Sequence, residues 1–423
     1  MLRRAQLLLV GVVLLVAALT TGAQFLYFLV YLGALVLIGA WLLTRLGLAG
    51  LEAGFGLDRP QAQAGETVRA WYTLRNRSRT PKLWLEVHSP STLPEAIPGR
   101  ALSLGSRATR SWFVDVPLTR RGHYRIDPMA IRTGDPFGLF TASAAVGSGT
   151  SLVVYPAVDP LPSWRLPPAL IEGSDAHAER THQSTPLVTG VRPYVTGDAF
   201  NRIHWKSSAR QMELQVKEFD LEQTADLWLF LDLDRSVHTG TEDDATIETA
   251  VRACASIAAK AAASNRSVGF EAVGTRRIVM SSDRGPRQQQ KVLHLLAAVQ
   301  PDGVVSLHEL LVDGLARLRR GMTAVVVTPS LDRGWVSPLA SLRRRGIGCA
   351  VCIVDPISHD VRSRILDGAP PMDPDERTAL DAELLALRHA LAEHELPPYV
   401  LIPGAPLGTQ IVSPSARLGV PAR

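Results

Sequence analysis

A long run without a charged residue, from position 5 to position 44, limits most strongly what this chain can fold into. As one helix the run would be about 60 Å long, about twice the thickness of the ~30 Å hydrocarbon core of a bilayer. Its most polar stretch, residues 20–24, interrupts it in the middle. We therefore expect two transmembrane helices within residues 1–48, near 5–21 and 25–43, joined by a tight turn.

The basic residues beside this run predict its orientation. Arg3 and Arg4 precede the first span, Arg45 follows the second, and the turn carries no charge. Because cytoplasmic flanks are enriched in Lys and Arg, both ends of the hairpin should face the cytoplasm. The sequence thus predicts a two-span protein of the cell membrane, with its soluble domains cytoplasmic and the lipid bilayer as a partner. The alternative is a cleaved signal peptide ending near Ala23, which would place the soluble region outside.

Composition narrows the class of protein further. The chain has 423 residues, 46% hydrophobic and 20% charged, with a mean hydropathy of +0.09, which excludes a wholly disordered chain. Lys and Arg number 45 against 40 Asp and Glu, and a net charge of +5 gives no reason to expect nucleic acid. Three cysteines exclude a fully paired disulfide framework and favour a reducing compartment.

Residues 55–156 have the pattern of short antiparallel strands. Polar and apolar residues alternate in runs such as 65–74, and Gly, Pro, Asn and Asp separate the runs at near-regular spacing. We expect a small all-β, sandwich-like domain here. Residues 135–140, Asp-Pro-Phe-Gly-Leu-Phe, are typical of a packed turn. The prolines that follow predict a linker over residues 157–190.

Strand and helix patterns then alternate from residue 224 to residue 405. Continuous apolar runs typical of buried parallel strands occur at 227–231, 323–328 and 348–354. This alternation predicts an α/β, doubly wound sheet, followed by a tail over 406–423.

Between the linker and this region, residues 191–223 form a segment dense in functional side chains. They are Arg192, Tyr194, Gly197, Asp198, Arg202, His204, Trp205, Lys206, Arg210, Lys217 and Glu218. We expect Asp198 to cap a short helix over residues 199–209. Three interpretations stay open: an internal clasp in which Trp205 fills a groove between domains, a surface for a partner or anionic ligand, or catalysis with His204 as base and Asp198 orienting it.

These residues, in this order, resemble the signature of a bacterial family called domain of unknown function fifty-eight. The matching positions are Tyr194, Gly197-Asp198, Arg202 to Lys206, Ala209-Arg210 and Val216 to Glu218, with 120–124 and 135–140 upstream. The resemblance covers nearly the whole chain. It implies a C-terminal domain like von Willebrand factor type A and a functional link to MoxR-type AAA+ ATPases.

Type A domains often hold Mg²⁺ through Asp-x-Ser-x-Ser, with a later Thr and Asp completing the site, and the resemblance extends to part of this motif. Asp232 and Ser236 match it, Asp234 replaces the first Ser, Ser306 is the candidate for the Thr, and the later Asp is displaced to Asp332. Mg²⁺ or another divalent cation prefers such oxygen ligands. The residues therefore either form a degenerate cation site or cap the turn that follows the strand.

The sequence as a whole predicts a membrane-anchored, non-enzymatic interaction or assembly protein that works with a MoxR-type AAA+ ATPase. It does not indicate the client protein. Two alternatives remain: a hydrolase that uses His204 with Asp198, and a metal-dependent adhesion module that faces the outside.

Overall fold

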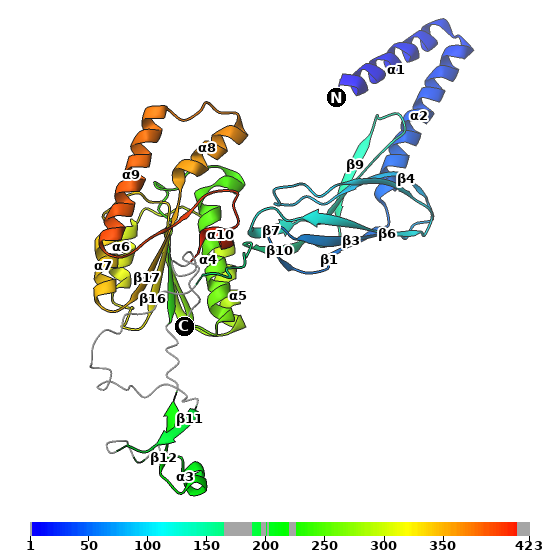
Figure 1. Cartoon of the computed structure of the whole chain (residues 1–423). Helices are drawn as coiled ribbons and strands as arrows, with labels where there is room; N and C mark the ends of the chain where they lie inside the picture. Colours follow the sequence, from blue (N-terminus) through cyan, green and yellow to red (C-terminus); the bar gives the residue numbers. More distant parts are fainter. Residues whose placement is uncertain (1, 165–187, 196–199, 201–202, 220–225, 413–423) are drawn as a thin grey trace. The chain divides into compact units, whose positions relative to one another are not determined.

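Two helices open the chain in the computed structural model, which describes residues 2–164, 188–195, 200, 203–219 and 226–412 (Figure 1). They are α1 (Leu2–Thr21) and α2 (Gln24–Leu48). The break between them lies in the polar stretch where the sequence predicted it. Gly22, at φ 65°, occupies the break, a conformation that glycine adopts without steric cost. Among the described residues, α2 is long and apolar enough to cross a membrane, whereas the apolar stretch Leu9–Thr21 is shorter.

A strand-rich region follows, as predicted, but it begins earlier than residue 55. Its strands are β1 (Leu51–Leu57), β2 (Gln61–Gln63), β3 (Thr67–Asn76), β4 (Lys82–His88), β5 (Arg100–Leu104), β6 (Thr109–Pro117), β7 (Gly122–Ile126), β8 (Met129–Gly134), β9 (Thr141–Val146) and β10 (Thr150–Tyr155). They form three sheets, ordered β1-β3-β6, β2-β10-β7 and β5-β4-β8-β9. Alternate residues of these strands, such as Val68, Leu74, Leu85 and Ile131, are fully buried in one common core.

The end of α2 packs directly on this strand-rich region. It contacts β4, β8 and β9, and Thr44 and Gly47 of its last turns are buried. A Cβ atom on Gly47 would lie 2.8 Å from Cγ2 of Thr133, so any larger residue here would require the Thr133 side chain to move. Helix α2 and the strands therefore belong to one compact unit, which consists of Met1–Val158 and Leu293–Val299.

The segment expected to carry the signature forms a small element of its own. Strands β11 (Val188–Pro193) and β12 (Gln215–Phe219) pair antiparallel, and α3 (Trp205–Gln211) lies between them in the sequence. The predicted helix over 199–209 is therefore wrong in register, because the helix begins at Trp205 and runs to Gln211. Residues 196–199, 201–202 and 220–225 lie outside the described residues.

The α/β region is built on one sheet with the strand order β15-β14-β13-β16-β17-β18. Its strands are β13 (Leu227–Leu231), β14 (Val268–Val273), β15 (Arg277–Asp283), β16 (Thr323–Thr328), β17 (Gly348–Val354) and β18 (Tyr399–Leu401). All neighbours are parallel except β15, which pairs antiparallel with β14 at the edge. The predicted α/β region with a mostly parallel sheet is confirmed.

Helices cover both faces of this sheet (Figure 1). They are η2 (Glu242–Asp244), α4 (Thr246–Ala263), α5 (Pro286–Ala298), α6 (Leu307–Gly314), α7 (Val336–Arg344), α8 (Pro356–Asp367), α9 (Pro374–Glu393) and α10 (Leu407–Gln410). Helices α6, α7 and α9 lie on one side and α4 on the other. Because both faces are covered, every residue of β13, β14, β16 and β17 is buried.

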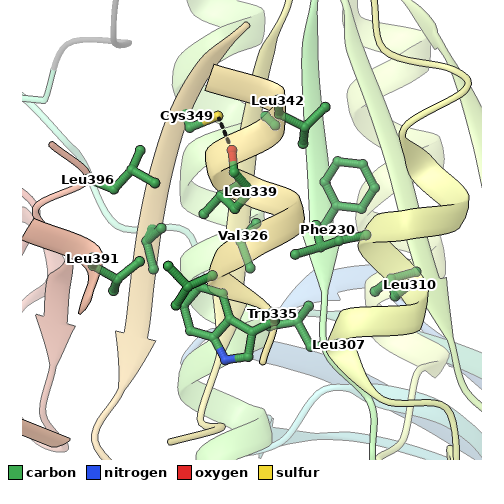
Figure 2. Close-up of a cluster of buried hydrophobic side chains, with 14 of the residues drawn as sticks. Phe230, Leu307, Leu310, Val326, Trp335, Leu339, Leu342, Cys349, Leu391 and Leu396 are labelled. Atoms are coloured by element: carbon green, nitrogen blue, oxygen red, sulfur yellow. Dashed lines mark hydrogen bonds between the residues drawn. The ribbon is translucent and has the colours of Figure 1, made fainter. Parts of the chain in front are cut away.

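The core under α6, α7 and α9 shows how these helices are held (Figure 2). Phe230 of β13 and Val326 of β16 lie on the same face of the sheet and are fully buried. Leu310 of α6, Trp335 before α7 and Leu391 of α9 pack in the same cluster. Burial of each such side chain contributes about 1.5–3 kcal/mol, so the helices are fixed chiefly by apolar contact.

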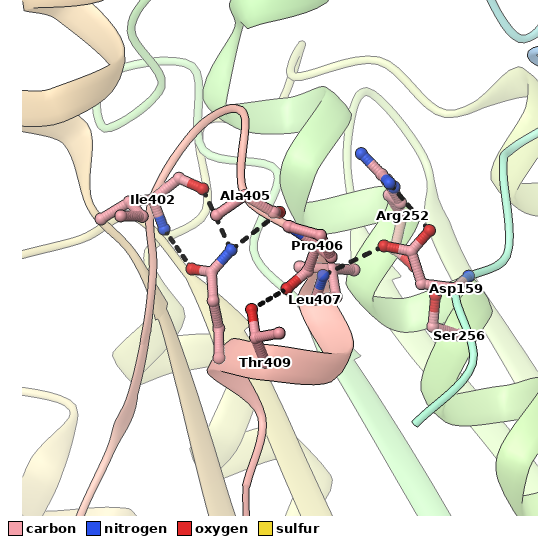
Figure 3. A network of polar contacts seen from close by, with 9 residues as sticks. Asp159, Arg252, Ser256, Ile402, Ala405, Pro406, Leu407 and Thr409 are labelled. Atoms are coloured by element: carbon pink, nitrogen blue, oxygen red, sulfur yellow. Dashed lines mark hydrogen bonds and ion pairs between the residues drawn. The ribbon is translucent and has the colours of Figure 1, made fainter. Parts of the chain in front are cut away.

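Segments from both ends of the α/β region close it around α4 (Figure 3). Asp159 accepts hydrogen bonds from Nη2 of Arg252 at 2.8 Å and from the backbone N–H of Leu407 at 3.2 Å, and its own N–H donates to Oγ of Ser256 at 2.9 Å. Leu407 and Ile411 are buried. The linker expected over 157–190 thus includes residues that pack on this region, and the tail expected from residue 406 begins with the packed helix α10.

Candidate functional site

The two strands at the centre of the sheet define the place where a site is expected. The chain passes from β13 outward to β14 and β15, then crosses to β16 and β17 on the other side. Ligands of open α/β sheets bind at the carboxyl ends of strands where the order reverses in this way. Leu231 of β13 lies beside Val327 of β16, so the residues that follow each strand meet at one edge.

Asp232 is the buried residue at this edge. It is 1% exposed, and its Oδ2 accepts a hydrogen bond from Oγ1 of Thr328 at 2.7 Å, while its Oδ1 accepts one from the N–H of Asp234 at 3.0 Å. Burial raises the pKa of this carboxyl to about 6, because the charged form loses its hydration and two donors only partly replace it. The contact of Thr328 with Asp232 was not predicted, although a polar residue at the end of an apolar strand was visible in the sequence.

The other residues of the predicted cation site make local hydrogen bonds. Asp234 Oδ1 accepts from the N–H of Ser236 at 3.0 Å and from its hydroxyl at 2.8 Å. Ser306 caps α6 by accepting from the N–H of Glu309 at 3.4 Å, and Asp332 Oδ1 accepts from the N–H of Gly334 at 3.1 Å.

Of the residues predicted to bind a cation, the structure brings together only those of the loop after β13. Asp232, Asp234 and Ser236 come from one short stretch of chain, while the oxygens of Ser306 and Asp332 serve a helix start and a turn. In the described part of the chain, no group of three or more His, Cys, Asp or Glu residues is arranged to hold a metal ion. The residues fit a divalent cation in part, and the cation site stays a prediction.

A groove of about 440 Å³ opens beside the Asp232 loop. Its walls are the loop after β13, the loop after β16 and helices α8 and α9. The lining side chains include three carboxylates, those of Asp332, Glu376 and Glu383, for which no ion pair is found among the described residues. A fourth, Asp360, pairs with Arg364 at 2.6 Å. The groove is therefore acidic, with apolar side chains such as Leu380 in the same lining, and we call it the acidic groove.

The signature segment has a different local chemistry. His204 caps α3, because its Nδ1 accepts a hydrogen bond from the N–H of Ser207 at 3.1 Å. The backbone N–H of His204 donates to the carbonyl of Gln215 at 2.7 Å. Ile203 is buried, whereas Trp205 is 66% exposed within the described residues. Because Nδ1 of His204 accepts the bond from Ser207, a neutral imidazole here carries its proton on Nε2, so this tautomer does not offer an open lone pair for proton transfer.

The remaining signature residues are only partly described. Arg192 donates to the carbonyl of Pro193 at 3.1 Å, the N–H of Tyr194 donates to the carbonyl of Leu214 at 2.8 Å, and the side chains of Lys206 and Arg210 on α3 are exposed. Gly197, Asp198 and Arg202 lie outside the described residues. Lys217 and Glu218 lie in β12, and the structure describes their backbone pairing only.

Comparison with known proteins identifies this part of the chain. The family model described as "Protein of unknown function DUF58" matches residues 190–366. The match covers these residues and not the whole chain. The resemblance drawn from the signature is thus confirmed, and the matched region includes the signature segment, the Asp232 loop and all but the last residue of α8.

Two further proteins are similar to this chain in sequence. The chain is 27% identical over 320 residues to "Uncharacterized protein YeaD" of Bacillus subtilis, covering 71% of this chain and 78% of the relative. It is 28% identical over 171 residues to "Uncharacterized protein Rv1480" of Mycobacterium tuberculosis, covering 39% of this chain and 54% of the relative. A CARDB domain from Pyrococcus furiosus is 12% identical, with a TM-score of 0.20, over 25% of this chain and 91% of that domain. A likeness of that TM-score supports no conclusion about this chain.

Proposed function

We propose that this protein is a membrane-anchored, non-enzymatic docking protein whose α/β domain, of the von Willebrand factor type A-like kind, binds a MoxR-type AAA+ ATPase. The acidic groove is the observation that carries the proposal. It lies at the switch point of the sheet, where such domains bind ligands, and it combines apolar lining with carboxylates that form no ion pair among the described residues. A partner surface with Lys or Arg beside apolar side chains complements it. The choice of ATPase follows from the family resemblance.

The proposed anchor is a two-helix hairpin with both ends in the cytoplasm. The length and apolarity of α2 support a membrane span. Arg45 in its last turn lies 5.3 Å over the ring of Trp41, a pairing suited to a membrane–water interface on the cytoplasmic side. The first span is proposed from the uncharged run that includes α1. In this arrangement a strand-rich, sandwich-like domain follows the membrane directly.

The docking proposal is tested with the purified full chain in detergent and a MoxR-type ATPase encoded by the same organism. We expect Glu376→Lys with Glu383→Lys to weaken binding at least tenfold, because two attractive charges in the groove become repulsive. The control is Asp283→Lys on the edge strand β15, compared with each of the single variants Glu376→Lys and Glu383→Lys, which change the charge by the same amount. Full-strength binding by the double variant, or no binding by the unchanged chain, would overturn the proposal.

Cysteine labelling tests the topology. The three native cysteines are buried, so Asp283→Cys adds one exposed thiol to a protein whose own thiols do not react while folded. A membrane-impermeant maleimide should label it only after the cells are permeabilised. Labelling on intact cells would instead place the soluble region outside, as the adhesion alternative requires.

A further inference from the structure

A second cavity lies where the membrane helix meets the strand-rich region. It has a volume of about 580 Å³ and lies between the end of α2, strand β4 and the turn that joins β8 to β9. Its lining includes Leu43 from α2, Lys82 and Trp84 from β4, Arg132 from β8, and Phe140. All of these elements belong to one compact unit. We call this cavity the α2 pocket.

Lys82 gives the α2 pocket a buried positive charge. It is 2% exposed, and its Nζ donates to the carbonyl of Leu46 in the last turn of α2 and to Oγ1 of Thr80 at 3.3 Å. Burial lowers the pKa of this ammonium, and no carboxylate acts against the shift. Buried charges are normally paired, and among the described residues Lys82 has no ion pair.

Arg132 adds a second cation to the lining. Its nearest carboxylate in the described part of the chain is Glu86, at the long distance of 4.0 Å, and both side chains are about half exposed. Asp135 also lines the pocket, but its carboxylate accepts hydrogen bonds from the N–H groups of Phe137 and Phe140. These donors hold its pKa low and compensate its charge. The pocket therefore presents two cations and one carboxylate that is already satisfied.

The surroundings of the pocket are suited to the surface of a bilayer. Leu83, Trp84 and Phe137 are 66%, 41% and 63% exposed. Trp41 and Arg45 mark the same end of α2 as an interface, within one turn of the pocket residue Leu43. If α2 spans the membrane, the α2 pocket lies at the depth of the lipid headgroups, where Trp side chains and cations both gather.

We propose that the α2 pocket binds the phosphate of an anionic phospholipid headgroup through Lys82 and Arg132, with an acyl chain running along α2 past Leu43. The phosphate supplies the counter-charge that Lys82 lacks, and its oxygens accept from both cations. Trp84 contacts the glycerol and upper acyl region. This inference depends on the membrane anchor proposed above and not on the ATPase.

Native mass spectrometry of the full chain in detergent tests this inference. We expect the protein to retain phosphatidylglycerol at least fivefold better than phosphatidylcholine of the same chain length. Lys82→Met and Arg132→Gln should each abolish this preference. The matched control is Arg110→Gln, which removes an exposed cation from β6, outside the pocket lining.

The outcomes separate the possible ligands. Equal retention of both lipids, or an unchanged preference in folded Lys82→Met and Arg132→Gln variants, overturns the proposal. Displacement of phosphatidylglycerol by millimolar inorganic phosphate, with no lipid preference left, overturns it too and indicates a free-anion site. Because Arg132 is exposed, its variant should fold even where Lys82→Met does not. Carbonate extraction of membranes checks the anchor separately, so failure of the anchor and failure of the lipid site are distinguishable.

Discussion

At the scale of single residues, Asp232 shows how a fold can hold an acid in an unfavourable place. It follows a fully buried strand, so its carboxylate lies where water is excluded, and its hydrogen-bond donors in the described part of the chain are the Thr328 hydroxyl and the Asp234 N–H. A group whose charged form is disfavoured in the folded state binds its proton more tightly there than in the unfolded chain. Its ionisation therefore opposes folding.

The pH dependence of stability follows from this position. The pKa of Asp232 rises from 3.8 to about 6, so stability should be greatest below pH 4 as far as this group is concerned. It should fall by about 3 kcal/mol as the pH rises from about 4 to about 6, since the folded state then holds a proton that the unfolded state has lost. Urea unfolding of Asp232→Asn, in EDTA, should lack this slope because the amide does not titrate.

Magnesium distinguishes the two interpretations of the same residue. A bound cation would stabilise the carboxylate and lower its pKa, so adding MgCl₂ should flatten the slope if the Asp232 loop holds a cation. An identical slope in EDTA and in MgCl₂ would assign the loop to capping alone. A slope of equal size in Asp232→Asn would contradict the pKa argument.

At the scale of elements, a buried ion pair fixes β14 to the segment that follows α6. Glu271 of β14 has a fully buried carboxylate, and Nη1 of Arg317 donates to its two oxygens at 2.9 and 3.0 Å. Nε of Arg277 lies 3.8 Å from the same carboxylate. Burial raises the pKa of Glu271 in spite of these two cations, so the charged form of the carboxylate depends on the presence of both arginines.

Removing Arg317 should therefore cost much more than removing a surface partner. We expect Arg317→Met to lower the free energy of unfolding by about 3 kcal/mol, because it strips a buried carboxylate of its main donor. Chemical denaturation of the full chain measures the change. Arg69→Met is the control: its pair with Asp115 at 2.8 Å is exposed, and we expect no measurable loss. Equal losses of unfolding free energy in the two variants would show that burial does not determine how much an ion pair stabilises this fold.

At the scale of the whole molecule, the α/β region is closed by residues far apart in the sequence. Asp159 and Leu407 meet beside α4, and Ile411 is fully buried just beyond α10. Domain boundaries drawn from composition placed these residues in a linker and a tail. Their packing shows that both segments contribute to the stability of the domain.

A pair of substitutions near the end of the chain tests this closure. Ile411→Ala should lower the free energy of unfolding by about 2–4 kcal/mol, because it leaves a cavity in a packed site. Thr409→Ala, two residues earlier and exposed, should cost far less. Thermal unfolding of the full chain compares the two. If both variants melt with the unchanged protein, residues after 406 would behave as a tail after all.

Much of this architecture was predictable because the forces that set it are local. The uncharged run and its polar break predicted α1 and α2, and the apolar runs of β13, β16 and β17 predicted buried parallel strands. The start of α3 was not predicted: His204, an uncommon cap, begins the helix six residues later than expected. Helix α8 was missed although Asp355 and Pro356 form a recognisable helix start.

The sequence by itself determined the order of the elements, the apolar faces they bury and the residues that follow each strand, because these features depend only on residues close together in the chain. Only the tertiary structure decided which side chains meet. It brought Asp332, Glu376 and Glu383 into one groove and Lys82 beside the end of α2. It also directed Ser306 and Asp332 to a helix start and a turn. These contacts join positions far apart in the chain, and their geometry depends on the packing of the whole domain.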